Sequence, residues 1–232
     1  MMIVVMSSNR TSHLLRGFFH QWSKYENDLD ALASTKMVIT ETEEPPTLWP
    51  PGWCIYYAGH DHPGQNWVGH LLKGLDWTHD EKFVLLLMDD YWLCQHVDHK
   101  GVIASLLKMQ GQTFPNKIDL SGDRRGFPHE PHSDGYIRSK NDADYLTSTQ
   151  AAIWQRDFLI ECLFNPAWTP WHFELEGTER IRGRDLCILS KLDPPIQYAN
   201  VSLRGQKELR LDRLTEEDLT ELREIGALKQ YE

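Results

Sequence analysis

Two adjacent carboxylates, Asp89 and Asp90, directly follow the most apolar segment of the chain, Phe83 to Met88. A continuous apolar run of this length predicts a strand that is buried on both faces, at the centre of a sheet. In an open α/β sheet, ligands bind beyond the carboxyl ends of the strands, which is where this pair lies. Carboxylate oxygens suit hard cations such as Mn²⁺ or Mg²⁺, which also take waters and substrate phosphates as ligands. The pair therefore predicts a divalent metal site, the alternative being that it only caps the next turn.

The two carboxylates are not equivalent in this prediction. Adjacent strand residues point to opposite faces, so we expect only one of them to touch the metal. Asp90 lies further beyond the sheet and is the first choice as a catalytic metal ligand, with Asp89 as the second. A cation held there would bridge the diphosphate of a nucleotide sugar and neutralise the charge that grows as the sugar leaves.

The elements that must position this pair alternate along the chain. Apolar runs predict strands at 2–6, 37–40, 53–58, 82–88, 117–121, 136–138 and 186–189. Helical spacing predicts helices at 14–25, 64–75, 97–109, 148–163 and 215–228, and a further helix that begins at Thr169-Pro170. Strands that alternate with helices predict an α/β fold with a mainly parallel sheet flanked by helices. We expect one domain at 1–204, with residues 205–232 as an amphipathic helical extension packed on it.

Composition narrows the class of protein. The chain has 232 residues, of which 34 are acidic and 24 basic, giving a formal net charge of −10. This balance argues against binding to nucleic acid, because duplex binders need a basic face. The apolar run at 2–6 is too short for a signal peptide or a membrane span, so we expect a cytoplasmic protein with at most peripheral membrane contact. No Walker A, GxGxxG or GxSxG pattern is present, which argues against NTPases, dinucleotide oxidoreductases and common serine hydrolases.

Two further segments carry a resemblance to a known family. Residues 148–159 read S-T-Q-A-A-I-W-Q-R-D-F-L, and residues 170–178 read P-W-H-F-E-L-E-G-T. Together with a strand that ends in paired acids, and with the opening Val-Val-Met-Ser-Ser-Asn, they resemble bacterial and viral GT-A-type glycosyltransferase-like proteins of polysaccharide biosynthesis. The resemblance covers about residues 2–205. It departs from the family in the acidic pair, which is adjacent here and lacks D-x-D spacing.

The resemblance implies a GT-A-like, Rossmann-like fold and a function. The protein would move a sugar from a nucleotide-diphosphate donor, which the family likeness implies is a UDP-sugar, to a glycan or lipid-linked acceptor. Glu174 takes the position of the catalytic base near the acceptor. Donor contacts are expected from three sets of residues: the loop Ser7, Ser8 and Asn9; Asp61, at a strand end near the base or ribose; and Gln150, whose amide can bond sugar hydroxyls.

Other interpretations remain open for these residues. Glu174 would be structural if it only stabilised the first turn of the helix that begins at Thr169-Pro170. The triplet His60-Asp61-His62 can also ligate a metal. The cations at 122–134 suit either a phosphate or acceptor clamp or a solvated loop. Trp92, Trp168 or Trp171 could form a sugar platform, and most tryptophans are expected in the core.

Two other functions compete with glycosyl transfer. A nucleotidyltransferase on a related α/β fold also uses carboxylates and Mg²⁺, although the loop after the first strand, Ser7-Ser8-Asn9-Arg10, lacks a glycine-rich basic signature. A non-catalytic nucleotide-sugar-binding homologue is the third possibility, because the acidic pair departs from D-x-D spacing.

Overall fold

A computed structural model describes residues 1–26, 28–41, 50–59, 66–78, 80–111, 114–202 and 209–229. The strands are β1 (Met2–Met6), β2 (Thr35–Thr40), β3 (Trp53–Tyr57), β4 (Phe83–Met88), β5 (Tyr91–Leu93), β6 (Lys117–Asp119), β7 (His129–Pro131), β8 (Tyr136–Ser139), β9 (Ala152–Gln155), β10 (Ile188–Lys191) and β11 (Tyr198–Asn200). The α-helices are α1 (Leu15–Tyr25), α2 (Trp67–Asp76), α3 (His99–Gln110), α4 (Arg156–Cys162), α5 (Pro170–Ile181) and α6 (Glu216–Glu224). Short 3₁₀ turns lie at η1 (Ser12–Leu14), η2 (Leu29–Leu32) and η3 (Asp123–Gly126).

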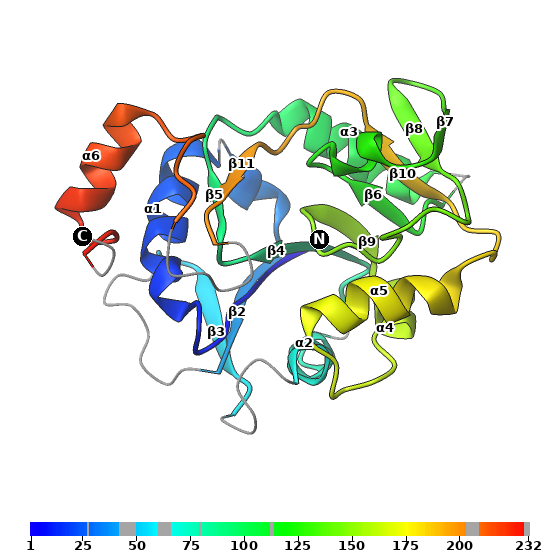
Figure 1. Cartoon of the computed structure of the whole chain (residues 1–232), viewed down its shortest axis with the longest axis horizontal. Helices are drawn as coiled ribbons and strands as arrows, with labels where there is room; N and C mark the ends of the chain where they lie inside the picture. Colours follow the sequence, from blue (N-terminus) through cyan, green and yellow to red (C-terminus); the bar gives the residue numbers. More distant parts are fainter. Residues whose placement is uncertain are drawn as a thin grey trace.

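The main sheet has the strand order β3-β2-β1-β4-β9-β6-β10-β8-β7 (Figure 1). Strands β1 to β4 pair in parallel, and so do β6 and β10, whereas β9 is antiparallel to both β4 and β6. The expected mixed, mainly parallel sheet flanked by helices is confirmed. The strand order reverses between β1 and β4, since β2 and β3 extend the sheet on one side of this pair and the later strands on the other, and such a switch point is where α/β folds place ligands.

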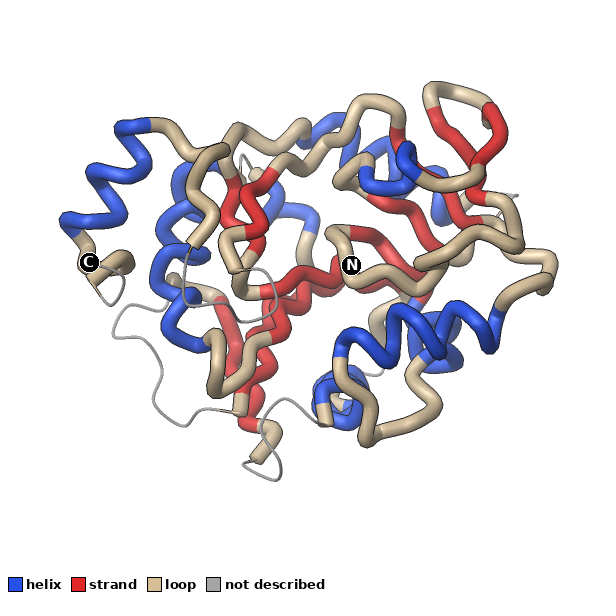
Figure 2. Tube along the Cα trace, viewed as in Figure 1, coloured by secondary structure: helices blue, strands red, loops and turns tan. Residues whose placement is uncertain are grey.

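Side-chain alternation divides the core between the two faces of the sheet. Ile3 and Val5 of β1 face the apolar cluster that includes α1, α3 and the β5–β11 pair, while Met2, Val4 and Met6 face α2, α4 and α5. Figure 2 shows the strands as a band through the molecule with helices on both sides. Burial on both faces explains why β1 and β4 are continuous apolar runs.

A second, two-stranded sheet joins distant parts of the chain. β5 follows Asp90 directly and pairs antiparallel with β11, so that Asn200 lies opposite Tyr91. Trp92 of β5 is fully buried, donates its indole N–H to the Leu14 carbonyl at 3.2 Å, and packs over Gly17 of α1. This packing fixes the chain on both sides of the acidic pair.

Helix α6 lies beside α1 at one side of the molecule (Figure 1). Polar side chains join the two helices. Asp218 is fully buried and accepts hydrogen bonds from Lys24 at 3.0 Å and from the Tyr25 hydroxyl at 2.9 Å. Asp218 also forms the predicted capping box with Thr215. The predicted boundary at 204/205 falls within residues 203–208, which lie outside the described residues.

The prediction of one helix over 148–163 is wrong. Residues 152–155 form β9, and only α4 is helical. Ile153 pairs with Leu85 on one side and Ile118 on the other, and Trp154 is fully buried. Apolar residues at 153, 154, 158 and 159 fit a helical period, but a short buried run reads the same in a central strand. Hydrogen-bonded pairing with β4 on one side and β6 on the other makes this segment a strand rather than a helix.

The remaining elements agree with expectation to within a few residues at their ends, except that β5, β7 and β11 were not predicted. In the described part of the chain, no helix combines the length and apolar character needed to span a bilayer.

Candidate functional site

Four segments of the chain meet at one edge of the sheet. The parallel strands β1 and β4 end there, with Ser7 and Asp89 just beyond them. Because β9 is antiparallel to β4, it begins at this edge, next to Gln150. β6 runs in the same direction as β4 and leads to Ser121. Side chains from the two halves of the sheet are therefore brought together at the switch point.

The acidic pair is buried without full compensation. Asp89 is 1% exposed, and Oδ2 of Asp89 and Oδ1 of Asp90 are buried with no hydrogen-bond partner among the described residues. Burial raises the pKa of Asp89 to about 7. Hydrogen bonds from the Ser7 and Thr11 hydroxyls act in the opposite direction, because they favour the charged carboxylate. Burial and the charge of Asp89 raise the pKa of Asp90 well above its usual range. A bound cation would favour the charged form of both groups, so the pair fits a divalent metal.

Asn200 of β11 faces Asp90. One terminal atom of its amide lies 3.2 Å from Asp90 Oδ2 and 3.3 Å from the Ser202 carbonyl oxygen. Because both neighbours are hydrogen-bond acceptors, the amide nitrogen occupies this position, and Asn200 donates hydrogen bonds to Asp90 and to the Ser202 carbonyl.

Other protein ligands for a metal are few. Within the described residues, no three His, Cys, Asp or Glu side chains gather closely enough to hold an ion. Mg²⁺ typically binds through one or two carboxylates, with waters and substrate phosphates completing its shell. Asp90, with Asp89 and Asn200 beside it, fits that mode of binding better than an all-protein cage.

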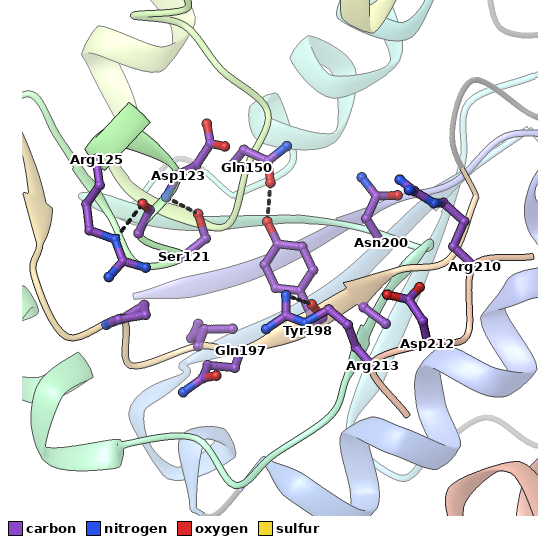
Figure 3. A pocket seen from close by; sticks show the side chains of 14 residues that line it. Ser121, Asp123, Arg125, Gln150, Gln197, Tyr198, Asn200, Arg210, Asp212 and Arg213 are labelled. Atoms are coloured by element: carbon purple, nitrogen blue, oxygen red, sulfur yellow. Dashed lines mark hydrogen bonds between the residues drawn. The ribbon is translucent and has the colours of Figure 1, made fainter. Parts of the chain in front are cut away.

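A cavity of about 430 Å³ opens between β11 and the residues that follow β6 (Figure 3). It is lined by Ser121, Gly122, Asp123, Arg125, Gln150, Pro194, Ile196, Gln197, Tyr198, Ala199, Asn200, Arg210, Asp212 and Arg213. Three arginines outnumber two aspartates on this wall. The Arg125 guanidinium donates hydrogen bonds to the carbonyls of Gly122 and Leu192, and the Arg213 guanidinium donates one to the carbonyl of Tyr198. These partners are neutral, so the contacts leave the positive charge available to an anion.

Two tyrosines hold the wall between β11 and β9. The Tyr91 and Tyr198 rings stack with centroids 4.3 Å apart and an interplanar angle of 18°. The Tyr198 hydroxyl donates to Gln150 Oε1, and the Tyr91 hydroxyl donates to the Thr149 carbonyl at 3.4 Å (Figure 3 shows the former). Gln150 is thus fixed in the cavity wall.

A second, smaller cavity adjoins the first and shares Asp123 and Gln150 with it. Its volume is about 180 Å³, and it is lined by Asp123, Phe127, Tyr145, Ser148, Gln150 and Glu174. Its charged groups are carboxylates, and its aromatic rings, Phe127 and Tyr145, lie 5.6 Å apart between centroids. The two neighbouring cavities therefore differ in charge, the larger being basic and the smaller acidic.

Glu174 lies in the second turn of α5, so the alternative role in the first turn is wrong. Its Oε1 accepts hydrogen bonds from the Thr149 backbone N–H and the Thr149 hydroxyl, both at 2.7 Å. The Nζ of the buried Lys117 donates a hydrogen bond to the carbonyl of the preceding residue, Ser148, at 2.9 Å. Glu174 therefore positions the chain just before Gln150 and at the same time lines the smaller cavity.

The other predicted site residues are distributed more widely. Gln150 lies at the site edge, just before β9, whereas helix α4, with Arg156 and Asp157 in its first turn, begins at the opposite end of that strand. Ser7, Ser8 and Asn9 follow β1 beside Asp89 and do not line either cavity. Their donor contacts stay a prediction. Asp61, with the His60-Asp61-His62 triplet, lies outside the described residues.

None of the three tryptophans considered as a sugar platform lines either cavity. Trp92 and Trp168 are buried in the core, and Trp171 is exposed but does not line a described cavity. The residues that sequence reasoning missed are Tyr198, Asn200, Arg210 and Arg213. They lie in or after a three-residue strand whose partner is distant in sequence, so no local pattern marks them.

No protein-family model matches this sequence, and no curated protein matches it. Solved structures do match. A structure described as UDP-glucose pyrophosphorylase complexed with UDP-glucose has a TM-score of 0.53 at 9% identity, covering 96% of this chain and 98% of that one. The bifunctional IspDF from Campylobacter jejuni has a TM-score of 0.49 at 13% identity, covering 92% of this chain. This chain spans 54% of that protein's length. At 9% identity the likeness to the pyrophosphorylase structure concerns the fold alone, and it agrees with the mainly parallel, Rossmann-like α/β architecture described above.

Proposed function

We propose that the protein is a metal-dependent transferase that binds a nucleotide-diphosphate sugar in the larger cavity and transfers the sugar to a hydroxyl presented from the smaller one. The observation that carries this proposal is the pair of adjoining cavities, one basic and one acidic. The incompletely bonded Asp89 and Asp90 line neither cavity, but Asn200, which lines the larger one, contacts Asp90. An anionic donor suits the basic cavity, and a hydroxylated acceptor suits the acidic one.

In the donor half of the reaction, positive charges of the protein and its metal would complement the negative diphosphate of the donor. Mn²⁺ or Mg²⁺ on Asp90 would neutralise the diphosphate while the bond between the anomeric carbon and its phosphate oxygen breaks. Arg125, Arg210 and Arg213 would bind the phosphate oxygens and any anion that leaves. Gln150, held by Tyr198 between the two cavities, is placed to bond a sugar hydroxyl.

The acceptor half needs a group that takes a proton as the hydroxyl attacks. Glu174 is the proposed base. Its Oε1 is engaged by Thr149, which leaves Oε2 as the oxygen for proton transfer. If the sugar keeps its configuration, the same carboxylate would instead orient the acceptor.

Nucleotidyl transfer is the second candidate, and the fold comparison favours it. The matched UDP-glucose pyrophosphorylase is described as bound to UDP-glucose, so nucleotide sugars are ligands of a protein with this kind of fold. In that reaction a sugar phosphate attacks a nucleoside triphosphate, so two anionic substrates must meet. The carboxylates of the smaller cavity suit a neutral second substrate better, and the loop Ser7-Ser8-Asn9-Arg10 lacks the glycine-rich basic signature expected of a nucleotidyltransferase.

Calorimetry tests the metal and donor steps. UDP and UTP are titrated into the protein with and without Mn²⁺, for the wild type and for Asp90→Asn. Asp157→Asn is the matched control, because its side chain is 99% exposed and lies at the opposite end of β9. We expect UDP binding that requires Mn²⁺, loses at least tenfold affinity in Asp90→Asn, and is unchanged in Asp157→Asn.

Product analysis separates the two reactions. With a panel of UDP-sugars and Mn²⁺, glycosyl transfer or donor hydrolysis releases UDP, whereas a pyrophosphorylase releases UTP when pyrophosphate is supplied. Preference for UTP, with pyrophosphate-dependent turnover, would establish nucleotidyl transfer instead. Nucleotide-sugar binding without turnover would favour a non-catalytic homologue, and absence of any nucleotide binding would refute all three functions.

A further inference from the structure

We propose that the smaller cavity is an acceptor subsite for one neutral pyranose ring, which stacks on Tyr145 and Phe127, and that the buried Arg124 builds this aromatic wall. The inference rests on the proposed function and adds the chemical class of the acceptor.

Arg124 is fully buried and connects both halves of the wall. Its Nη1 donates to the Asp144 carbonyl at 2.9 Å and to the Tyr145 carbonyl at 2.7 Å. Its Nε donates to the Ser139 hydroxyl at 3.1 Å, and its guanidinium carbon lies 4.6 Å from the centroid of the Phe127 ring. A single side chain from η3 therefore fixes the backbone of one aromatic residue and the ring of the other.

Tyr145 is held in an unfavourable conformation. Its φ is +54°, a region that bulky L residues rarely adopt, and its side chain is 37% exposed. Such a conformation costs about 1–3 kcal/mol and persists only where the surroundings enforce it. The hydrogen bond from Arg124, and that from the Ser148 N–H at 3.0 Å, hold the Tyr145 carbonyl. The strain keeps an aromatic ring at the mouth of a polar cavity, where core packing does not require one.

The lining selects among acceptors. Aromatic faces carry partial negative charge and attract the C–H face of a sugar ring. Asp123, Glu174 and Gln150 supply oxygens that accept hydrogen bonds from sugar hydroxyls. The same two carboxylates repel a phosphate or a uronic acid. The combination fits a neutral, hydroxylated ring better than an anionic or an apolar acceptor.

Substitution of Tyr145 allows a test that spares the fold. Its side chain supplies no hydrogen bond that holds the loop, since the contacts above use its carbonyl. Glycine adopts φ +54° readily, so Tyr145→Gly removes the ring and relieves the strain. Tyr145→Phe keeps the stacking face and is the matched control.

The assay is saturation-transfer NMR with methyl glycosides of glucose, galactose, mannose and N-acetylglucosamine, in the presence of UDP and Mg²⁺. Methyl glucuronide is the charged comparison. We expect at least one neutral glycoside to bind the wild type and Tyr145→Phe, with affinity about tenfold weaker in Tyr145→Gly, and the glucuronide to bind more weakly than its neutral counterpart. The urea midpoint of Tyr145→Gly should be no lower than that of the wild type.

Two results would overturn the subsite. Either no neutral glycoside binds the wild type, or glycosides bind equally well to Tyr145→Gly. Calorimetry with UDP and Mg²⁺ on the same proteins reports the donor site separately. If the nucleotide binds and removal of the Tyr145 ring does not change glycoside affinity, the subsite is refuted and the transferase proposal stands. If glycoside binding requires Tyr145 and no nucleotide binds, the transferase proposal is refuted and the sugar subsite stands.

Discussion

Replacing Asp89 with asparagine should stabilise the protein in the absence of metal, and should do so more strongly as pH rises. Burial raises the pKa of Asp89 from the ordinary 3.8 to about 7 in the folded state. Between these values the folded chain holds a proton that the unfolded chain has lost. Folded stability contributed by this group is therefore fully present below about pH 4 and is lost as pH rises towards 7.

The magnitude follows from the same two values. A difference of about 3 pH units, at roughly 1.4 kcal/mol each, amounts to about 4 kcal/mol lost by the wild type above neutral pH. Asp89→Asn carries no charge at any pH and has nearly the same shape. The stability difference between variant and wild type should thus grow by about 2–3 kcal/mol from about pH 5 to about pH 8.

Urea unfolding of both proteins across that pH range, without divalent cations, measures this difference directly. The comparison cancels other titrating groups, such as His13, whose pKa burial lowers. Adding Mn²⁺ and UDP should narrow the gap, because a ligand that binds the charged pair stabilises the wild type more than the variant. A difference that stays constant between about pH 5 and about pH 8 would refute the reasoning that Asp89 is a buried, uncompensated acid.

Three other substitutions have specific expected outcomes. Gly17→Ala places a Cβ 2.1 Å from a Trp92 ring carbon, so thermal unfolding should show a loss of about 1–3 kcal/mol. Glu174→Ala leaves the buried backbone N–H that it accepts from without a partner, so chemical denaturation should show a loss of about 1–3 kcal/mol even without substrate. Although burial opposes the shift, hydrogen bonds from Thr215 and α1 lower the pKa of Asp218 to about 2. Its contribution is therefore present above about pH 4 and lost towards pH 2, and acid unfolding of Asp218→Asn should lack this loss.

Sequence reasoning located the acidic pair because the relevant pattern is local. A buried central strand must be apolar along its whole length, and the polar residues that follow it must lie at the sheet edge. The same local logic predicted α5 from Thr169-Pro170 and α6 from its capping box. These features depend on residues that are close together in the chain, so a local sequence pattern is enough to predict them.

The partners of the pair depend on contacts between distant segments. Asn200 reaches Asp90 only because β11 pairs with β5 across more than a hundred residues, and both strands are three residues long. Likewise, exposure of aromatic rings is set by tertiary packing. Trp92 is fully buried over Gly17, whereas Tyr145, whose carbonyl accepts a hydrogen bond from a buried arginine, is partly exposed. Neither outcome has a periodicity or a motif that could have revealed it.

The charge distribution also ties the proposals together. The chain is strongly acidic overall, yet three arginines outnumber two aspartates in the wall of the larger cavity, where Asn200 contacts the buried Asp90. A cation alone would satisfy the carboxylates but add to the positive charge of the arginines, and a diphosphate alone would do the opposite. Only the two together complement the whole surface, so metal and nucleotide should bind with mutual dependence. Measured coupling between Mn²⁺ and UDP, equal in either order of addition, is what this arrangement requires.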